Sequence, residues 1–173
     1  MQKYDITIIG GGVLGTSLSY WLSLLYEGNI AVLEMEPGVA RHTSGRNTGV
    51  IHRPFYMDPE KRKVFARCAQ ISFGLWGTYA KLKGLPWSPV GTIEVATDER
   101  QIKILEKYHL WALKNGMKDS EVEFLTPLDV HKLEPNVECL GAIHSKTDTS
   151  VDYRAFTESL KEDAAAKDRK SVV

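Results

Sequence analysis

Cysteine is scarce in this sequence, with only Cys68 and Cys139 among 173 residues. Neither lies in a C-x-x-C pair or in a Cys/His spacing typical of a zinc site. Two distant cysteines also do not form the disulfide framework of a small secreted domain. We therefore predict no metal site and no disulfide scaffold, and we expect the protein to reside in a reducing cytoplasm.

An excess of charge of either sign is also missing. Lys and Arg together number 22, as do Asp and Glu, and the formal net charge is +0. No basic cluster is interleaved with aromatic residues in the way that favours nucleic-acid binding. The content of 43% hydrophobic and 25% charged residues is ordinary for a globular protein. We expect small molecules or other proteins as partners, and no nucleic acid.

Charged residues are absent from Ile6 to Tyr26, a span long enough to cross a bilayer or to resemble a signal peptide. However, the span contains four glycines and three serines, and no basic cluster precedes it. Its glycines also lie together, where a turn between two elements would need them. We therefore predict a strand followed by a helix, and no transmembrane segment.

The glycine turn inside this span is the most informative feature of the sequence. Residues 4–9 form an apolar, β-branched run that predicts a strand covered on both faces. Gly10, Gly12 and Gly15 follow with G-x-G-x-x-G spacing, which allows a tight turn, close approach of a pyrophosphate and close packing of the next helix. The helix predicted over 14–26 points its free N–H groups and positive dipole end at the same place. The turn therefore predicts an anion site.

A second apolar run, residues 29–33, ends at Glu34, nineteen positions after Gly15. A carboxylate there can accept hydrogen bonds from both ribose hydroxyls of an adenine nucleotide and would repel a 2′-phosphate. NADP is therefore disfavoured. Because strand, turn, helix, second strand and acid occur in this order, a nucleotide-binding βαβ unit is favoured over a purely structural turn.

The following loop, residues 40–54, is rich in glycine, small hydroxyl side chains and arginine. It leaves the carboxyl end of the second predicted strand, the edge where open α/β sheets bind ligands. Its hydroxyls and backbone amides suit a pyrophosphate and a heteroaromatic ring. By composition alone, the same run is equally typical of a surface loop.

Apolar periodicity and capping residues predict the remaining elements. The expected helices cover 59–82, 99–115, 126–134 and 153–166, and the expected strands cover 90–96 and 140–144. On the first of these helices we expect a buried stripe formed by Phe65, Cys68, Ser72, Leu75, Trp76, Tyr79 and Leu82. Asp98 and Asp152 are predicted N-caps, with Gln101 as the reciprocal partner of Asp98.

Three motifs together resemble the N-terminal portion of FAD-dependent oxidoreductases of the D-amino-acid oxidase and glycerol-3-phosphate dehydrogenase superfamily. These motifs are the glycine turn at 8–15, the strand end at 32–36 and the loop at 43–52. The run from Arg46 to His52 is most similar to the L-2-hydroxyglutarate dehydrogenase-like branch. Residues 89–98 and 151–154 also look like the family.

The resemblance implies FAD as the cofactor. It assigns cofactor binding to Gly10, Gly12, Val13, Leu14, Gly15, Glu34, Met35, Thr43, Ser44, Arg46, Asn47, Gly49, Val50 and Ile51. The residues of the glycine turn would lie along the pyrophosphate, and Glu34 would hold the adenosine ribose. Thr43 and Ser44 would contact the pyrophosphate or ribityl chain, and residues 49–51 would run beside the isoalloxazine.

His52, Arg53 and Tyr56 are the implied catalytic residues, with His52 facing the substrate side of the flavin ring. A histidine can hold a carboxylate or take a hydroxyl proton as hydride leaves carbon. The alternative is a loop histidine that only hydrogen-bonds backbone. Arg53 and Tyr56 are close enough in sequence to share the site.

The resulting fold prediction is α/β: a Rossmann-like FAD-binding βαβ unit of the glutathione-reductase type with part of a mixed α+β substrate domain. We expect residues 1–83 in the FAD-binding domain, 84–150 in the substrate domain, and 151–173 as a helix returning to the FAD domain. Two parallel strands are marginal alone, so the fold is expected to be incomplete and to need a complementary chain or a homo-oligomer. Residues 170–173 look like the approach to another strand.

The predicted function is an FAD-dependent oxidoreductase that transfers hydride to FAD from a small 2-hydroxy acid, polyol phosphate or amino acid. One alternative is a truncated or split-enzyme subunit that binds a nucleotide or partner chain without catalysis by itself. A third interpretation is an NAD-dependent dehydrogenase, which is weaker because no nicotinamide-side motif follows. The sequence does not indicate the electron acceptor.

Overall fold

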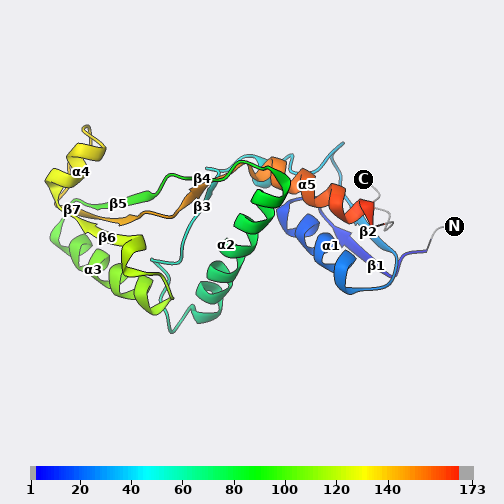
Figure 1. The fold of residues 1–173 in the computed structure, drawn as a ribbon, viewed down its shortest axis with the longest axis horizontal. Helices are drawn as coiled ribbons and strands as arrows, with labels where there is room; N and C mark the ends of the chain where they lie inside the picture. The colour runs from blue at the N-terminus through cyan, green and yellow to red at the C-terminus, as the bar shows by residue number, and fades with distance from the viewer. Residues whose placement is uncertain (1–2, 168–173) are drawn as a thin grey trace. The chain divides into compact units, whose positions relative to one another are not determined.

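The computed structural model describes residues 3–167, which form two compact units. Unit 1 comprises residues 3–49, 82–86 and 151–167, and unit 2 comprises residues 50–81 and 87–150. The helices and strands of each unit are labelled in Figure 1. The predicted strand approach at 170–173 lies outside the described residues.

Unit 1 contains the predicted βαβ motif. Strands β1 (Ile6–Ile9) and β2 (Ile30–Leu33) pair in parallel and are joined by helix α1 (Val13–Leu25). Ile8 packs with two residues of β2 and with Leu22 of α1 to form a small apolar core. The sequence prediction of an α/β fold built on this turn is confirmed. None of the helices within residues 3–167 is both long and apolar enough to cross a membrane.

Helix α5 (Tyr153–Ala166) packs alongside α1 in unit 1 (Figure 1). The Asp152 carboxylate accepts hydrogen bonds from the amides of Arg154 and Ala155, so it is the predicted N-cap. The residues that α1 buries are small and polar, namely Thr16, Ser19 and Ser23. Small side chains on α1 allow its neighbours to approach closely, because the distance between packed helices depends on side-chain size.

Unit 2 is built around a three-stranded antiparallel sheet in the order β5-β7-β6. Strand β5 covers Thr92–Ala96, β7 covers Gly141–Ser145 and β6 covers Val122–Leu125. In the register, β5 pairs with all five residues of β7 and β6 pairs with four of them. The sequence prediction missed β6, whose four residues are too few to show a clear alternating pattern.

Helices α3 (Glu99–Lys114) and α4 (Pro127–Leu133) pack on this sheet. Ile143 of β7 joins the apolar cluster that contains Leu105 of α3. The adjacent residue of the same strand, Ala142, packs instead with Val130 of α4. Because successive residues of a strand point to opposite faces, α3 and α4 cover opposite faces of the sheet.

The start of α3 is capped as predicted, with one difference. The Asp98 carboxylate accepts from the amides of Arg100 and Gln101. The side chain of Gln101, however, reaches the Thr97 amide and not that of Asp98. A residue one position before the cap therefore takes part in starting the helix.

A second, small sheet of unit 2 has the order β3-β8-β4. Its strands are β3 (Val50–Ile51), β8 (Thr149–Ser150) and β4 (Ser88–Pro89), and both pairs are antiparallel. Strands of two residues have no periodicity, so the sequence did not reveal β3 or β8. This pairing, together with Phe55 in the core beside α3, associates residues 50–81 with unit 2. The compact units therefore divide the chain differently from the predicted boundary at residue 83.

Helix α2 (Lys63–Lys83) departs from the prediction in the face that it buries. Its buried residues are Ala66, Tyr79 and Ala80. The predicted stripe is therefore only partly buried: Tyr79 is buried and Ser72 and Trp76 are half-buried, whereas Phe65, Cys68, Leu75 and Leu82 are exposed. Periodicity shows which residues share a face of the helix, but not how much of that face another segment covers.

We predict that Gly15 is required for the stability of unit 1. A Cβ atom on Gly15 would lie 2.0 Å from the Gly10 carbonyl oxygen, which is backbone and cannot rotate away. Gly15→Ala should lower the free energy of unfolding by roughly 1–3 kcal/mol or more, as overpacking does. The measurement is urea denaturation followed by circular dichroism.

The matched control is Gly74→Ala in α2, where a Cβ would meet no atom within 4 Å. That change should stabilise by about 0.5–1 kcal/mol, since alanine favours a helix interior. Equal stability of the two variants would contradict the close approach of α1 to the glycine turn.

Candidate functional site

The first candidate site lies in unit 1, where the glycine turn leads into α1. Gly10 has a φ of +106°, a conformation that glycine adopts readily. Gly12 is the N-cap of α1 and has no side chain to satisfy the first helical amides. The Ser44 hydroxyl, supplied by the following loop, accepts a hydrogen bond of 2.9 Å from the Val13 amide.

Ser44 thus lies directly at the N-terminus of α1, as the prediction of a shared anion site requires. A Cβ atom on Gly12 would lie 2.9 Å from the Ser44 Oγ. Gly12 therefore makes room for a protein side chain, a role that the sequence analysis did not foresee. The Ser44 hydroxyl keeps its own proton for donation, because it accepts from Val13.

Glu34 lies beside the same turn. Its Oε2 accepts from the Gly11 amide at 2.5 Å, and its Oε1 accepts from the Glu36 amide at 3.0 Å. These hydrogen bonds, that from Gly11 first, lower the pKa of Glu34 below its ordinary value. The group is therefore a carboxylate at neutral pH, and its remaining lone pairs can accept from hydroxyl groups. The sequence did not predict the contact with Gly11, since it joins residues 23 positions apart.

Asn47 organises the loop that carries Ser44. Its side-chain nitrogen donates to the carbonyls of Thr43 and Ser44, both at 3.1 Å, and its oxygen accepts from the Gly49 amide at 2.8 Å. All three contacts lie inside the loop. The side chains of Thr43, Arg46 and Met35 are exposed, and within residues 3–167 none of them hydrogen-bonds to the glycine turn.

The second candidate site lies in unit 2 and begins where β3 ends. Val50 and Ile51 pair with β8, and His52 is the next residue. The Nδ1 atom of His52 lies 2.7 Å from Oδ2 of Asp148, a side chain that is completely buried. The sequence analysis missed Asp148, because it occurs in a polar run, residues 145–150, that reads as a turn.

Arg53 is placed differently from His52, with its side chain directed into unit 2. The guanidinium donates to Gln70, Thr147 and both carboxylate oxygens of Glu121. It also stacks over the ring of Phe73, 4.4 Å from the ring centre. Only 8% of the side chain is exposed, so the contacts of Arg53 are those of a structural residue. We therefore leave Arg53 out of the catalytic group proposed below.

Tyr56, the third predicted catalytic residue, lies near His52. The two rings meet edge to face with centres 6.5 Å apart, and 37% of Tyr56 is exposed. Burial raises the pKa of Tyr56, and the negative charge of Asp148 adds to the effect. The phenol is therefore a neutral hydrogen-bond donor at physiological pH. Glu94, whose pKa burial also raises, lies close enough to contribute to the shift.

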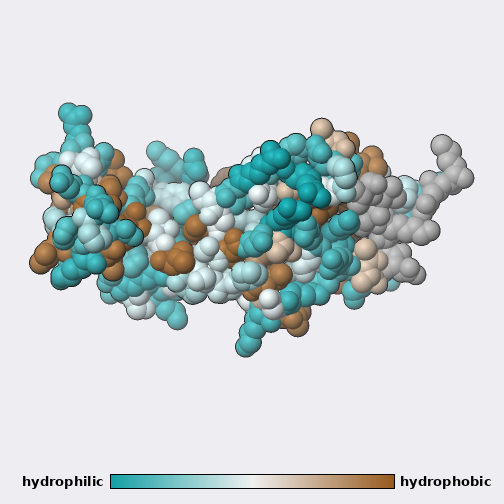
Figure 2. Space-filling view, turned by 90° about the horizontal axis from the view of Figure 1, so that it is seen from above, coloured by the Kyte–Doolittle hydropathy of each residue, from teal (hydrophilic) through white to brown (hydrophobic). Residues whose placement is uncertain are grey.

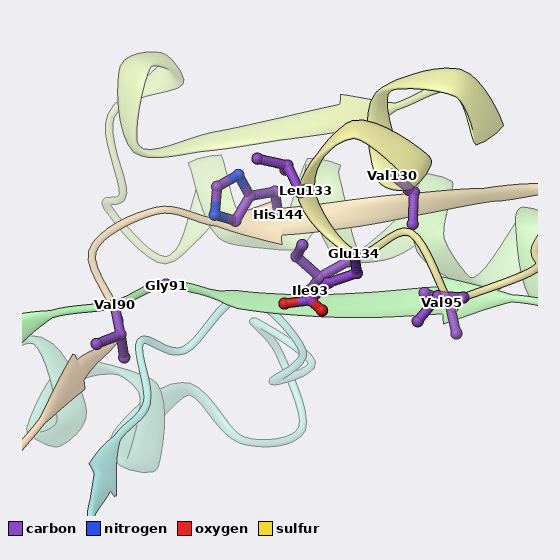
Figure 3. Close-up of a pocket in the computed structure, with 9 residues that line it drawn as sticks. Val90, Gly91, Ile93, Val95, Val130, Leu133, Glu134 and His144 are labelled. Carbon is purple, nitrogen blue, oxygen red and sulfur yellow. The ribbon is translucent and has the colours of Figure 1, made fainter.

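A pocket of about 490 Å³ lies elsewhere in unit 2, between the sheet and α4 (Figure 3). Its walls are mainly apolar, with His144 and Glu134 as the polar residues among Val90, Gly91, Ile93, Val95, Val130, Leu133 and Val137. None of the residues predicted for cofactor or substrate binding lines it. It occupies the α4 face of the sheet, whereas Phe55, beside Tyr56, packs with the cluster on the α3 face. We therefore do not assign the substrate to this pocket.

Comparisons with known proteins identify a matching family and several similar sequences. A family model described as FAD dependent oxidoreductase matches residues 5–169. The mitochondrial L-2-hydroxyglutarate dehydrogenase of Homo sapiens is 33% identical over 163 residues, which cover 94% of this chain and 34% of that protein. The glycerol 3-phosphate oxidase of Mycoplasma pneumoniae is 33% identical over 138 residues, covering 79% of this chain and 35% of that protein.

Solved structures match over nearly the whole chain. The dithionite-reduced L-alpha-glycerophosphate oxidase from Mycoplasma pneumoniae with FAD bound gives a TM-score of 0.86 at 26% identity, covering 99% of this chain and 45% of that chain. The L-proline dehydrogenase from P. horikoshii gives a TM-score of 0.82 at 20% identity, covering 99% of this chain and 44% of that chain, which supports the fold alone. The chain spans about a third of the length of the curated relatives that it matches.

The ion pair between Arg53 and Glu121 leads to a prediction about the stability of the protein at acidic pH. Desolvation raises the pKa of Glu121, but hydrogen bonds from the Lys118 amide and from Arg53 outweigh it, and the net pKa lies below the ordinary 4.5. A lowered folded-state pKa contributes stability above about pH 4.5 that is lost as pH falls through the folded value. The free energy of unfolding should therefore decrease on acidification below pH 4.5.

Glu121→Gln should reduce stability at pH 7 and flatten this part of the pH profile, because Gln cannot titrate. The measurement is urea denaturation at a series of pH values. Asp119→Asn, an exposed acid in the same 3₁₀ turn, is the control and should leave the profile unchanged. Identical profiles for wild type and Glu121→Gln would contradict the proposed contribution of the pair.

Proposed function

We propose a function from one established premise: the chain belongs to the FAD-dependent oxidoreductase family. The protein binds FAD through unit 1 and oxidises a small substrate by transfer of hydride to the flavin. The observation that carries this proposal is the meeting of three groups at one turn: the N-terminus of α1, the Ser44 hydroxyl and the Glu34 carboxylate. The first two groups suit a pyrophosphate, and the third suits the hydroxyls of a ribose.

The residues of unit 1 fit FAD in their chemistry. The amides of the first turn of α1 have no intrahelical partners, and a phosphate is a natural acceptor for them. Ser44 has a hydroxyl proton to donate in addition. In the proposed site Glu34 and Met35 bind adenosine, and the pyrophosphate region is bound by Gly10, Gly12, Val13, Leu14, Gly15, Thr43 and Ser44. The resemblance assigns Gly49 of unit 1, and Val50 and Ile51 of unit 2, to the flavin ring. Asn47 shapes the loop, and Arg46 supplies positive charge.

Bound FAD supplies the hydride acceptor, and the protein supplies orientation and proton transfer. We propose that His52 takes the hydroxyl proton of the substrate and that Tyr56 donates a hydrogen bond to the substrate. A small 2-hydroxy acid is the favoured substrate, because several relatives at 32–34% identity are named as L-2-hydroxyglutarate dehydrogenases. A polyol phosphate is the second candidate, favoured by the glycerol 3-phosphate oxidase at 33% identity. An amino acid is the third, since amine oxidation would use the same groups.

We also propose that further polypeptide covers α1, either as a complementary segment or as a second copy of the chain. Leu14, Leu18, Trp21 and Leu25 form one stripe along this helix and are 84%, 49%, 44% and 79% exposed. Hydrophobic residues interrupt the polar surface in several places in Figure 2. Contiguous apolar surface of this kind is typical of a face that is covered in the working protein.

This surface also supports the second candidate function, a subunit that binds a nucleotide or a partner chain without catalysis by itself. Turnover of a 2-hydroxy acid by the purified protein would exclude that alternative. An NAD-dependent dehydrogenase is disfavoured by the family match. The cytoplasmic location stays a prediction.

We predict that Glu34→Gln weakens FAD binding without unfolding the protein. The uncharged amide loses a charge-assisted interaction with ribose, and the dissociation constant for FAD should rise at least about tenfold. The measurement is a titration of flavin fluorescence with the apoprotein. Glu36→Gln is the matched control, because Glu36 is a neighbouring acid whose carboxylate contacts His42. An unchanged dissociation constant would remove Glu34 from the site, and binding of NADH but not FAD would overturn the cofactor assignment.

We predict that a polypeptide of these 173 residues self-associates through α1, and that Leu25→Glu shifts it towards monomer. A charge on the stripe should oppose burial of this face. The measurement is sedimentation velocity over a range of protein concentrations. The control is Leu110→Glu, which changes a leucine of α3 that is 59% exposed. A wild-type polypeptide that stays monomeric, or an equal effect of both variants, would contradict the assignment of this surface.

A further inference from the structure

We propose that Asp148 is a positioning residue, which holds the His52 ring with its proton on Nδ1 and leaves Nε2 as the proton acceptor. The inference rests on the proposed function where it assigns Nε2 to the substrate hydroxyl. The state of the His52 ring itself is independent of any substrate and can be measured separately.

The backbone of the small sheet brings the two residues together. Val50 pairs with Ser150 and Ile51 pairs with Thr149. Extending this antiparallel register by one residue sets His52 opposite Asp148, and opposite residues project to the same side. The main chain at Asp148 is held as well, because its carbonyl accepts from the amides of Val90 and Gly91 at 3.1 and 2.9 Å. Contacts other than the one with His52 therefore help to hold the Asp148 main chain in place.

The Asp148 carboxylate is surrounded by donors. Oδ2 meets Nδ1 of His52 at 2.7 Å, and Oδ1 accepts from the Arg53 amide at 3.0 Å and from the Ser145 hydroxyl. The side chain of Asp148 is 0% exposed, so protein groups make up its surroundings. A carboxylate has only acceptor atoms, and therefore Nδ1 must carry the proton in this contact. In the neutral ring, Nε2 is then the atom with the free lone pair.

The other side of the His52 ring is open. The side chain is 40% exposed, and Nε2 has no hydrogen-bond partner within residues 3–167. The acceptor nitrogen is thus the accessible one, while the donor nitrogen is anchored in the interior. A histidine that only hydrogen-bonded backbone, the alternative reading of the sequence, would not need a buried carboxylate.

The proton balance follows from this arrangement. The substrate O–H bond breaks and its proton moves to Nε2, while hydride leaves the adjacent carbon with the C–H electron pair for the flavin, and a C=O bond forms. The ring is then an imidazolium that still donates through Nδ1. The negative charge of Asp148 stabilises this positive charge, as a carboxylate does for other catalytic histidines.

Asp148→Asn should reverse the tautomer of His52, because it changes the hydrogen-bonding groups of the side chain while its shape stays nearly the same. The Arg53 amide can only donate, so the Asn oxygen has to occupy the Oδ1 position. The Asn NH₂ group then faces Nδ1 of His52, which must accept, and the ring proton moves to Nε2. The open nitrogen would become a donor, and it could no longer take the hydroxyl proton.

The first experiment is long-range ¹H–¹⁵N NMR of the full-length protein with labelled histidine, using His52→Ala to assign the His52 signals. We expect the Nδ1–H tautomer in the wild type, and the Nε2–H tautomer in Asp148→Asn. Ser145→Ala is the matched control, because it removes a donor to the same carboxylate and leaves the contact with His52. A wild-type ring protonated on Nε2 would overturn the proposal, even if the Asn variant fails to fold.

The second experiment compares steady-state rates with a 2-hydroxy acid and measures flavin content in parallel. His52→Ala should lower kcat/KM by roughly 10²–10⁴-fold and Asp148→Asn by at least about tenfold, both with unchanged flavin content. The double variant should be no slower than His52→Ala, because Asp148 acts through His52. A wild-type rate in Asp148→Asn, or a lower rate with an unchanged tautomer, would overturn the positioning role. If the wild type oxidises no 2-hydroxy acid, the proposed function fails, and the NMR result still decides how His52 is held.

Discussion

The buried carboxylate of Asp148 joins three separate segments of unit 2. Its oxygens accept from His52 and Arg53 after β3 and from Ser145 at the end of β7, and its carbonyl accepts from the turn at residues 90–91. A buried charge is costly unless donors surround it, and here each oxygen has at least one. The position of His52 and the inward course of Arg53 both depend on this one group. Arg53 then extends the network to Glu121, so this neighbour of the candidate catalytic histidine is a structural residue.

Unit 1 has a comparable centre in the glycine turn. Glu34 approaches the turn from the end of β2, and Ser44 approaches it from the following loop. These contacts hold together the groups that a dinucleotide needs before any ligand is present. Gly15 is necessary for a reason internal to the protein, because a side chain there would strike the backbone carbonyl of Gly10. The packing of the turn therefore explains this glycine without reference to a ligand.

The two units differ in how well their elements are covered. The sheet of β5, β7 and β6 has helices on both faces, and its central strand is largely buried. The two strands of unit 1 have α1 on one side, while Ile9 and Leu33 on the other face are 88% and 48% exposed. Buried parallel strands are normally covered on both faces. This contrast is the physical reason for expecting further polypeptide on unit 1 and not on the central sheet of unit 2.

The local sequence determined the parts of this protein that depend on neighbouring residues. The β-branched run before Gly10, the caps at Asp98 and Asp152 and the acid after β2 predicted the βαβ unit, the helix starts and the nucleotide site. The tertiary structure decided what depends on residues far apart in the chain. It brought Asp148 to His52 across 96 positions, turned Arg53 inward and left part of the apolar stripe of α2 exposed. Periodicity shows that a face is apolar, and capping residues show where a helix begins, but only the pairing of distant strands determines which side chains meet.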